Sequence, residues 1–222
     1  MDSETLLLLV GLGGILALDG TALGQFMISR PLVAGALAGW ILGSPGTGLL
    51  VGSVLEIYLI PVFPVGGSRF PEGGPASVVA VAAAVALPGA GGLALGTVLG
   101  LVWSQVGAGS IGAVRSLNGR IVPDPEKGEI SAGKVTRSHL AGMGLELCRG
   151  ALLTLAGLGL AALLARALTG VWPLSLLPTL ALLALGASVP GGGLAASLGG
   201  WRRRWALFGA GFALFLFGGL LL

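Results

Sequence analysis

Charged side chains are scarce in this sequence. Only 9% of its 222 residues are Asp, Glu, Lys or Arg, whereas 55% are hydrophobic, and the mean hydropathy is +0.98. A soluble domain usually carries about a quarter charged residues. Because so few charges could hardly cover a soluble surface, the composition predicts an integral membrane protein that lies in the lipid bilayer.

Cysteine and histidine are nearly absent. The single cysteine, Cys148, excludes an intramolecular disulfide framework and a metal site made only of cysteines. The single histidine, His139, lies elsewhere in a polar stretch, so the sequence offers no nucleophile–base pair and no metal cluster for an intramembrane enzyme. We therefore expect no catalytic residues, no metal and no cofactor. The basic pI near 9.8 comes from loop residues and bears on membrane topology rather than on nucleic-acid binding.

Apolar runs are abundant, although several of them are shorter than a membrane span, which needs about 20 residues. The start, MDSE, is acidic where a signal peptide would be basic, so we expect the first run to be retained as a span. Glycine, proline and single polar residues interrupt the runs before residue 90, a pattern typical of transporters and channels with broken helices. The apolar runs are 5–18, 31–42, 48–62, 76–87, 92–114, 147–168, 174–189 and 205–222.

Two basic clusters predict the orientation in the membrane. The first lies in the polar stretch 115–139, and the second is the arginine run 202–204. By the positive-inside rule both face the cytoplasm. Three spans follow the polar stretch, so we expect the C-terminus outside, and we expect the N-terminus outside as well.

The predicted fold class is all-α: a polytopic transmembrane helical protein with broken helices and a re-entrant loop. We expect a single integral membrane domain, 1–222. Its N-terminal part, 1–114, holds the re-entrant loop near 61–75. A cytoplasmic loop, 115–140, separates it from a C-terminal transmembrane part, 141–222.

Glycines recur every fourth residue in three of the apolar runs, which places them on one face of a helix. Small residues on one face let helices approach closely in lipid, so most of these glycines are expected to pack helices. The strings GLLVGSVLE (48–56) and GLALGTVLG (92–100) also resemble each other, either as an internal repeat or by chance. They differ at their ends, where the first has Glu56 and the second has Gly100.

Acidic residues within the apolar runs are candidates for function, because a carboxylate in a span costs about 2.5–3.5 kcal/mol. Glu56 follows two glycines on its own helix face and is either a ligand contact or a buried acid bonded to backbone or to an arginine. Asp19 either contacts ligand or caps the next segment, and Gln25 continues the same polar connection. Glu146 is expected to pair with Arg149, which should itself extend to the membrane interface.

The stretch YLIPVFPVGGSRFPEGGPAS (58–77) cannot be a regular helix, because its prolines and glycine pairs forbid it. At membrane depth such backbone is tolerated only when it is buried in protein or lines a wet cavity. Its open N–H and C=O groups suit a polar ligand such as a sugar, although an ordinary exposed loop is the alternative. The candidate ligand contacts in this stretch are Gly66, Gly67, Ser68, Arg69 and Glu72.

The run from Ser29 to Glu72 resembles the N-terminal half of the membrane subunit IIC of the mannose/fructose/sorbose family of the bacterial phosphotransferase system. The resemblance rests on Arg30-Pro31-Leu32-Val33, Gly52, Leu55-Glu56, Pro64-Val65-Gly66-Gly67 and Pro71-Glu72. It covers residues 15–80 most specifically, and the C-terminal third agrees only in hydropathy.

This resemblance implies a permease subunit of the cell inner membrane that carries a hexose-like sugar. It implies a second membrane subunit, IID, cytoplasmic IIA and IIB subunits that phosphorylate the sugar, and a homo-oligomer, in this family a trimer. His139 has no phosphoacceptor context, so phosphate would travel on the partner chains. Two other functions fit the same residues: an ion-coupled secondary transporter that uses Glu56, and a non-transporting receptor or scaffold.

Overall fold

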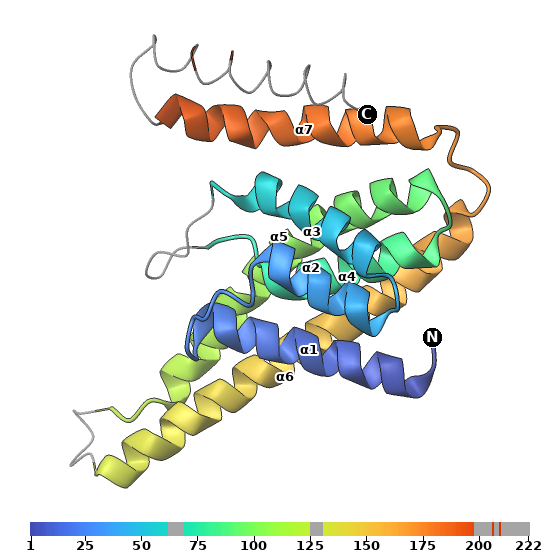
Figure 1. The fold of residues 1–222 in the computed structure, drawn as a ribbon. Coiled ribbons are helices and arrows are strands. Elements are labelled where there is room, and N and C mark those ends of the chain that lie inside the picture. The colour runs from blue at the N-terminus through green and yellow to red at the C-terminus, as the bar shows by residue number, and fades with distance from the viewer. Residues whose placement is uncertain (62–68, 125–130, 198–205, 207–208, 210–222) are drawn as a thin grey trace.

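The computed structural model describes residues 1–61, 69–124, 131–197, 206 and 209, and this part of the chain is helical without strands (Figure 1). The all-α prediction is therefore confirmed. The helices are α1 (Ser3–Thr21), α2 (Pro31–Ile41), α3 (Pro45–Leu59), α4 (Gly73–Ala86), α5 (Ala90–Ile121), α6 (Ala132–Leu168) and α7 (Leu176–Ser197). The last predicted apolar run, 205–222, lies almost wholly outside the described residues.

Helix length separates two groups of elements. Among the described helices, four are long and apolar enough to cross a membrane: α1, α5, α6 and α7. The other three, α2, α3 and α4, have only 11, 15 and 14 residues. At 1.5 Å per residue such helices fall short of a hydrocarbon core about 30 Å thick. The chain is thus a multi-pass membrane protein in which spanning helices pack with a set of half-length helices, as the broken apolar runs predicted.

Glycines bring α2 and α3 into backbone contact. A Cβ atom added to Gly48 would lie 2.3 Å from the carbonyl oxygen of Gly35, and one added to Gly39 would lie 2.7 Å from the Cα of Gly48. Proline begins each helix, at Pro31 and at Pro45, where its fixed φ suits the first turn and its missing N–H costs nothing. The expected helix-packing role of these glycines is confirmed.

The short helix α4 is the centre of the bundle. It contacts α1, α2, α3, α5 and α6, and it is apolar and small on every side, so it is buried almost throughout. Glycines on α5 permit its close contact with that helix: a Cβ at Gly92 would lie 2.3 Å from the carbonyl oxygen of Ala84, and one at Gly96 would lie 2.5 Å from that of Ala80. The two similar strings therefore occupy equivalent places, since each forms the second helix of a glycine-packed hairpin.

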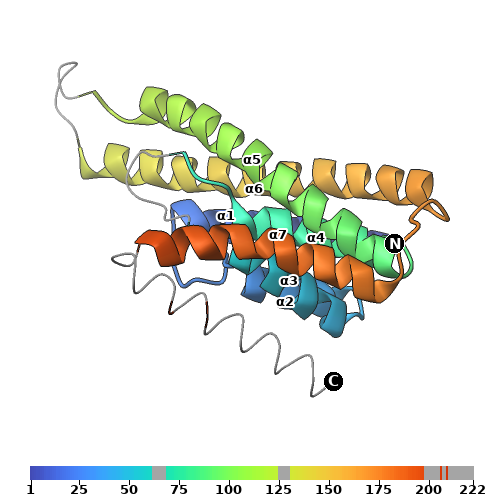
Figure 2. The same cartoon turned by 90° about the horizontal axis from the view of Figure 1, so that it is seen from above.

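Helices α5 and α6 run on well past the other helices (Figures 1 and 2). With 32 and 37 residues they exceed a membrane span. The polar stretch expected as a loop over 115–140 is thus largely helical: α5 continues to Ile121, and α6 begins at Ala132 after the N-cap Ser131, whose hydroxyl accepts from the Lys134 amide. The start of α6 is therefore marked by a short polar capping side chain and not by a change from polar to apolar sequence.

The directions of the helices place each terminus and connection at one of two opposite ends of the bundle (Figure 1). The N-terminus, the turns after α2 and α4, and the connection from α6 to α7 share one end. The connection from α1 to α2, the start of α4 and the extension of α5 and α6 share the other, which we call the basic end. It carries Arg30, Arg69, Arg120, Lys134 and Arg137, whereas Arg166 lies toward the opposite end. Most of the described basic residues thus lie at one end, as a common cytoplasmic side requires, whereas the arginine run 202–204 lies outside the described residues.

Candidate functional site

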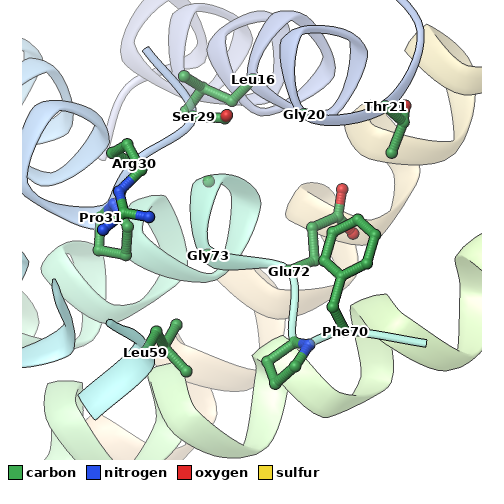
Figure 3. Close-up of a pocket in the computed structure, with 12 residues that line it drawn as sticks. Leu16, Gly20, Thr21, Ser29, Arg30, Pro31, Leu59, Phe70, Glu72 and Gly73 are labelled. Atoms are coloured by element: carbon green, nitrogen blue, oxygen red, sulfur yellow. The ribbon is translucent and has the colours of Figure 1, made fainter. Parts of the chain in front are cut away.

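A pocket lies where four helix ends meet, at the end of α1, the start of α2, the end of α3 and the start of α4 (Figure 3). Its volume is about 90 Å³. Apolar and polar side chains share its wall, among them Thr21, Arg30, Leu59, Phe70 and Glu72. The broken helices thus create a recess whose wall is mainly apolar and carries a few polar groups, at the kind of place where transporters built from broken helices bind their ligands.

The backbone at the start of α4 is held against its neighbours. The amide of Glu72 donates to the carbonyl oxygen of Ser104 on α5, at 2.9 Å. A Cβ at Gly74 would lie 2.9 Å from the Cβ of Leu16, so only glycine allows α4 to approach α1 here. The segment that leads from residue 69 into α4 is therefore fixed on two sides, and this fixes the direction in which Phe70 and Glu72 face the pocket.

Glu56 is bound to an arginine in the structure. Arg30 donates to Glu56 Oε1 through Nε, at 2.7 Å, and through Nη2. The Leu32 amide donates to Glu56 Oε2 at 3.3 Å. The pair joins the start of α2 to the last turns of α3. Glu56 itself is absent from the pocket wall, whereas Arg30 belongs to it, so the carboxylate orients the arginine that faces the pocket.

Asp19 holds the connection between α1 and α2. Its two carboxylate oxygens accept from the backbone amides of Phe26 and Ser29, at 2.7 and 3.0 Å. The side chain is 4% exposed and does not line the pocket. This arrangement is the capping alternative for Asp19, because it satisfies amides that lead into the next helix.

A buried charge cluster lies behind the pocket. Arg149 of α6 donates to both oxygens of Glu72, from Nη1 to Oε2 at 2.7 Å and from Nη2 to Oε1 at 2.6 Å. It also donates to Glu146, from Nε to Oε2 at 3.1 Å and from Nη2 to Oε1. Glu146 accepts in turn from the hydroxyl of Thr21, at 2.8 Å. The cluster links α1, α6 and the start of α4.

This cluster changes one expectation and confirms another. The pair of Glu146 and Arg149 is present, as their spacing of three residues predicted. The prediction that Arg149 extends to the membrane interface is wrong, because its side chain is buried and bound to two carboxylates. Arg166, at the other end of the same helix, is exposed.

The remaining sequence candidates are dispersed. Gln25 is exposed in the connection before α2, has a positive φ of 53° and does not line the pocket. Arg69 is exposed directly before Phe70. Gly66, Gly67 and Ser68 lie outside the described residues. Of all the candidates that the sequence indicated as ligand contacts, Glu72 is the one found in the described part of the pocket wall.

Sequence reasoning missed Arg30, Phe70 and the link from Glu72 to Arg149 as parts of the site. Arg30 was visible as the basic residue before Pro31, and a helix start at the end of a polar connection is a signal for a ligand-facing position. The link to Arg149 spans 77 residues of sequence. No local pattern reveals such a contact.

Comparison with known proteins identifies the family. The family described as "PTS system sorbose-specific iic component" matches residues 5–222. A curated relative, the "PTS system sorbose-specific EIIC component" of Lacticaseibacillus casei, is 35% identical over 60 residues, which make up 27% of this chain. The aligned stretch spans only 22% of that relative's own length.

Two solved structures share the fold. One, described as "Structure of membrane protein", aligns with a TM-score of 0.77, and the other, a complex of the mannose transporter ManYZ with microcin E492, aligns with a TM-score of 0.64. Each is 18% identical, with 98% of this chain and 88% of the other covered. The sequence resemblance is confirmed: this chain belongs to the sorbose-specific IIC family of the bacterial phosphotransferase system.

Proposed function

We propose that this chain is the sugar-translocating IIC subunit of a mannose-family phosphotransferase system in the cell inner membrane. It carries a hexose-like sugar across the bilayer for phosphorylation by partner subunits. Family membership supports the class of activity. The observation that carries the proposal for this chain is the pocket at the meeting of four helix ends, with Arg30, Glu72 and Phe70 in its wall.

The chemistry of the wall suits a sugar. Arg30 uses Nε and Nη2 on Glu56, which leaves guanidinium N–H groups for ligand hydroxyls. The side chain of Arg30 is 33% exposed, so these donors are accessible. The hydroxyl oxygens of Thr21 and Ser29 and the carboxylate of Glu72 supply acceptors, and the ring of Phe70 supplies an apolar face. A sugar ring presents the same combination of hydroxyl edges and apolar C–H faces.

The roles of the sequence candidates follow from their positions. Arg30 and Glu72 contact the sugar, Glu56 holds Arg30, and Asp19 holds the backbone that leads to Ser29. Residues 66–69 lie directly before Phe70 in the chain, and we retain Gly66, Gly67, Ser68 and Arg69 as proposed contacts. Gln25 contributes through the same connection as Asp19.

Partner subunits complete the system. We propose a membrane subunit IID, cytoplasmic IIA and IIB subunits that carry the phosphoryl group, and a homo-oligomer of this chain, a trimer by family resemblance. ManYZ, whose fold this chain shares, is a mannose transporter, which supports a sugar as cargo. His139 is exposed on α6 with arginine and lysine as its nearest charged neighbours in sequence, and we assign it no phosphoryl transfer.

The energy source tests this proposal. Cells that contain this chain with its IID, IIA and IIB partners should take up sorbose or mannose only while phosphoenolpyruvate is available, and the sugar should appear inside as its phosphate. Uptake that follows an ion gradient and delivers unmodified sugar would instead support an ion-coupled transporter. The ion pair of Glu56 with Arg30 argues against that alternative, because the carboxylate charge already has a partner.

A further inference from the structure

We infer that Arg149 of α6 is a positioning residue of the proposed sugar site, and that it acts through Glu72. The identity of the ligand as a sugar rests on the proposed function, whereas the positioning of Glu72 by Arg149 concerns this chain alone. Nothing in the local sequence joins α6 to the pocket, since Glu72 lies 77 residues before Arg149.

The guanidinium of Arg149 has all its donors in use. Arginine carries five N–H groups in a fixed fork. The five bonds of Arg149 run to Glu72 twice, to Glu146 twice and once from Nη1 to the hydroxyl oxygen of Ser110, at 2.6 Å. Ser110 donates its own proton to the carbonyl oxygen of Gly107, at 2.8 Å. A fully used planar fork permits a single arrangement of its partners, so Arg149 fixes both the position and the plane of the Glu72 carboxylate.

The same carboxylate faces the pocket and has hydrogen-bond acceptor sites that Arg149 does not use. Each carboxylate oxygen can accept two hydrogen bonds. Arg149 occupies one site on each oxygen of Glu72. The second site on each oxygen is available for a ligand hydroxyl. Arg149 thus orients the carboxylate of Glu72 and aims its remaining acceptor sites without touching the ligand.

Gly107 of α5 provides the space that this arrangement needs. A Cβ at Gly107 would lie 2.6 Å from Oε2 of Glu72 and 2.7 Å from its Cβ. Rotation of the Glu72 side chain can relieve the contact with Oε2, but the Cβ of Glu72 is fixed by its backbone, so an alanine at this position displaces both the carboxylate and the segment that carries it. Gly109, on the same helix, has no described atom within 4 Å of an added Cβ.

The cluster is poor evidence for stability alone. Two carboxylates, Glu72 and Glu146, share one guanidinium, and all three side chains are at most 8% exposed. Buried ion pairs often stabilise no better than apolar residues of the same volume, because desolvation offsets their attraction. The arrangement does orient the carboxylate of Glu72 beside the pocket, and a role in packing alone would not require such an orientation.

The first experiment measures the position of the Glu72 segment without any sugar. Phe70→Cys is introduced together with Cys148→Ser, and the rate of maleimide alkylation is measured in the purified, assembled protein. Arg149→Lys keeps the charge but loses the fork, so alkylation at position 70 should accelerate several-fold. Arg166→Lys, on the exposed opposite end of α6, should leave the rate unchanged. An unchanged rate in assembled Arg149→Lys overturns the inference.

The second experiment measures binding of sorbose and mannose to the chain with its natural cysteine and Phe70 restored. Arg149→Lys and Gly107→Ala should each weaken binding by about tenfold, whereas Arg166→Lys and Gly109→Ala should not. In a Glu72→Gln background, Arg149→Lys should weaken binding no further, because both changes act on one carboxylate. Additive losses would mean that Arg149 acts independently of Glu72, and the inference would be wrong.

The outcomes separate the two proposals. If the wild-type chain binds neither sugar, the proposed cargo fails, and the alkylation rates still decide whether Arg149 positions the segment. If Arg149→Lys does not assemble, Gly107→Ala decides: a changed alkylation rate at position 70 supports the positioning of Glu72 against α5, and an unchanged rate with unchanged binding overturns it.

Discussion

Arg30 and Glu56 form an ion pair that fastens the beginning of α2 to the end of α3, with Nε of the arginine 2.7 Å from Oε1 of the carboxylate. The glycine contacts between these two helices lie along the same hairpin. The pair therefore closes the end of the hairpin that borders the pocket, and it turns the guanidinium of Arg30 toward that pocket.

Replacement of Glu56 by Gln tests this relationship. The amide keeps the shape of the side chain but loses the charge, so the hold on Arg30 weakens. Sugar affinity should fall by about tenfold, since one charge-assisted bond contributes about 1.5–3 kcal/mol. Equilibrium binding to the purified protein measures the change.

Ser53→Ala on the same helix is the matched control, because the hydroxyl of Ser53 donates to the carbonyl oxygen of Leu49 in its own helix. It should bind sugar like the wild type. If Glu56→Gln also bound like the wild type while Glu56→Ala failed to assemble, Glu56 would be a structural acid without effect on the site.

Close packing of the α2–α3 hairpin gives a second prediction. Gly48→Ala would bring a Cβ within 2.3 Å of a backbone carbonyl oxygen that cannot swing away. We expect a loss of about 1–3 kcal/mol in the free energy of unfolding, as for other overpacked interiors. Thermal unfolding in detergent measures it. Gly46→Ala, on the same helix with no described atom within 4 Å of the added Cβ, should be neutral, and equal losses in both variants would contradict the packing account.

Membrane orientation gives a third prediction. In a Cys148→Ser background, Gly133→Cys lies at the basic end, and Val171→Cys lies at the opposite end, where Val171 is 63% exposed. A membrane-impermeant thiol reagent added to intact cells should label position 171 and not position 133, because the positive-inside rule predicts that the basic end faces the cytoplasm. The reverse labelling pattern would invert the orientation.

Much of the fold could be predicted from the sequence, because the length of an apolar run and the position of proline are both local features that indicate where a helix begins, ends or spans the bilayer. The predicted runs 31–42 and 76–87 agree closely with α2 and α4, and the polar interruptions correctly indicated broken helices. The helical extension beyond the bundle was not predicted, because the polar residues and glycine in 115–140 are typical of a loop. In the structure, α5 and α6 contact each other there instead of lipid.

The site was only partly predictable for a related reason. Glu56 was recognised as a special acid, and the bond to an arginine was one of the alternatives considered for it. Which arginine binds which acid depends on helix packing: Arg30 meets Glu56 across a hairpin, whereas Arg149 meets Glu72 through the centre of the bundle. Local spacing shows only the pair of Glu146 and Arg149, and the place of Arg149 at the end of an apolar run favoured an interfacial position for an arginine that is buried.

The central claim is that the pocket at the four helix ends binds the transported sugar, and protection of a pocket cysteine by sugar tests it most directly. Ser29→Cys in a Cys148→Ser background places a thiol in the pocket wall. In the assembled transporter, saturating sorbose or mannose should slow alkylation of this thiol, and Arg30→Gln should abolish the protection. Unchanged alkylation of Ser29→Cys at a sugar concentration that saturates uptake would contradict the account.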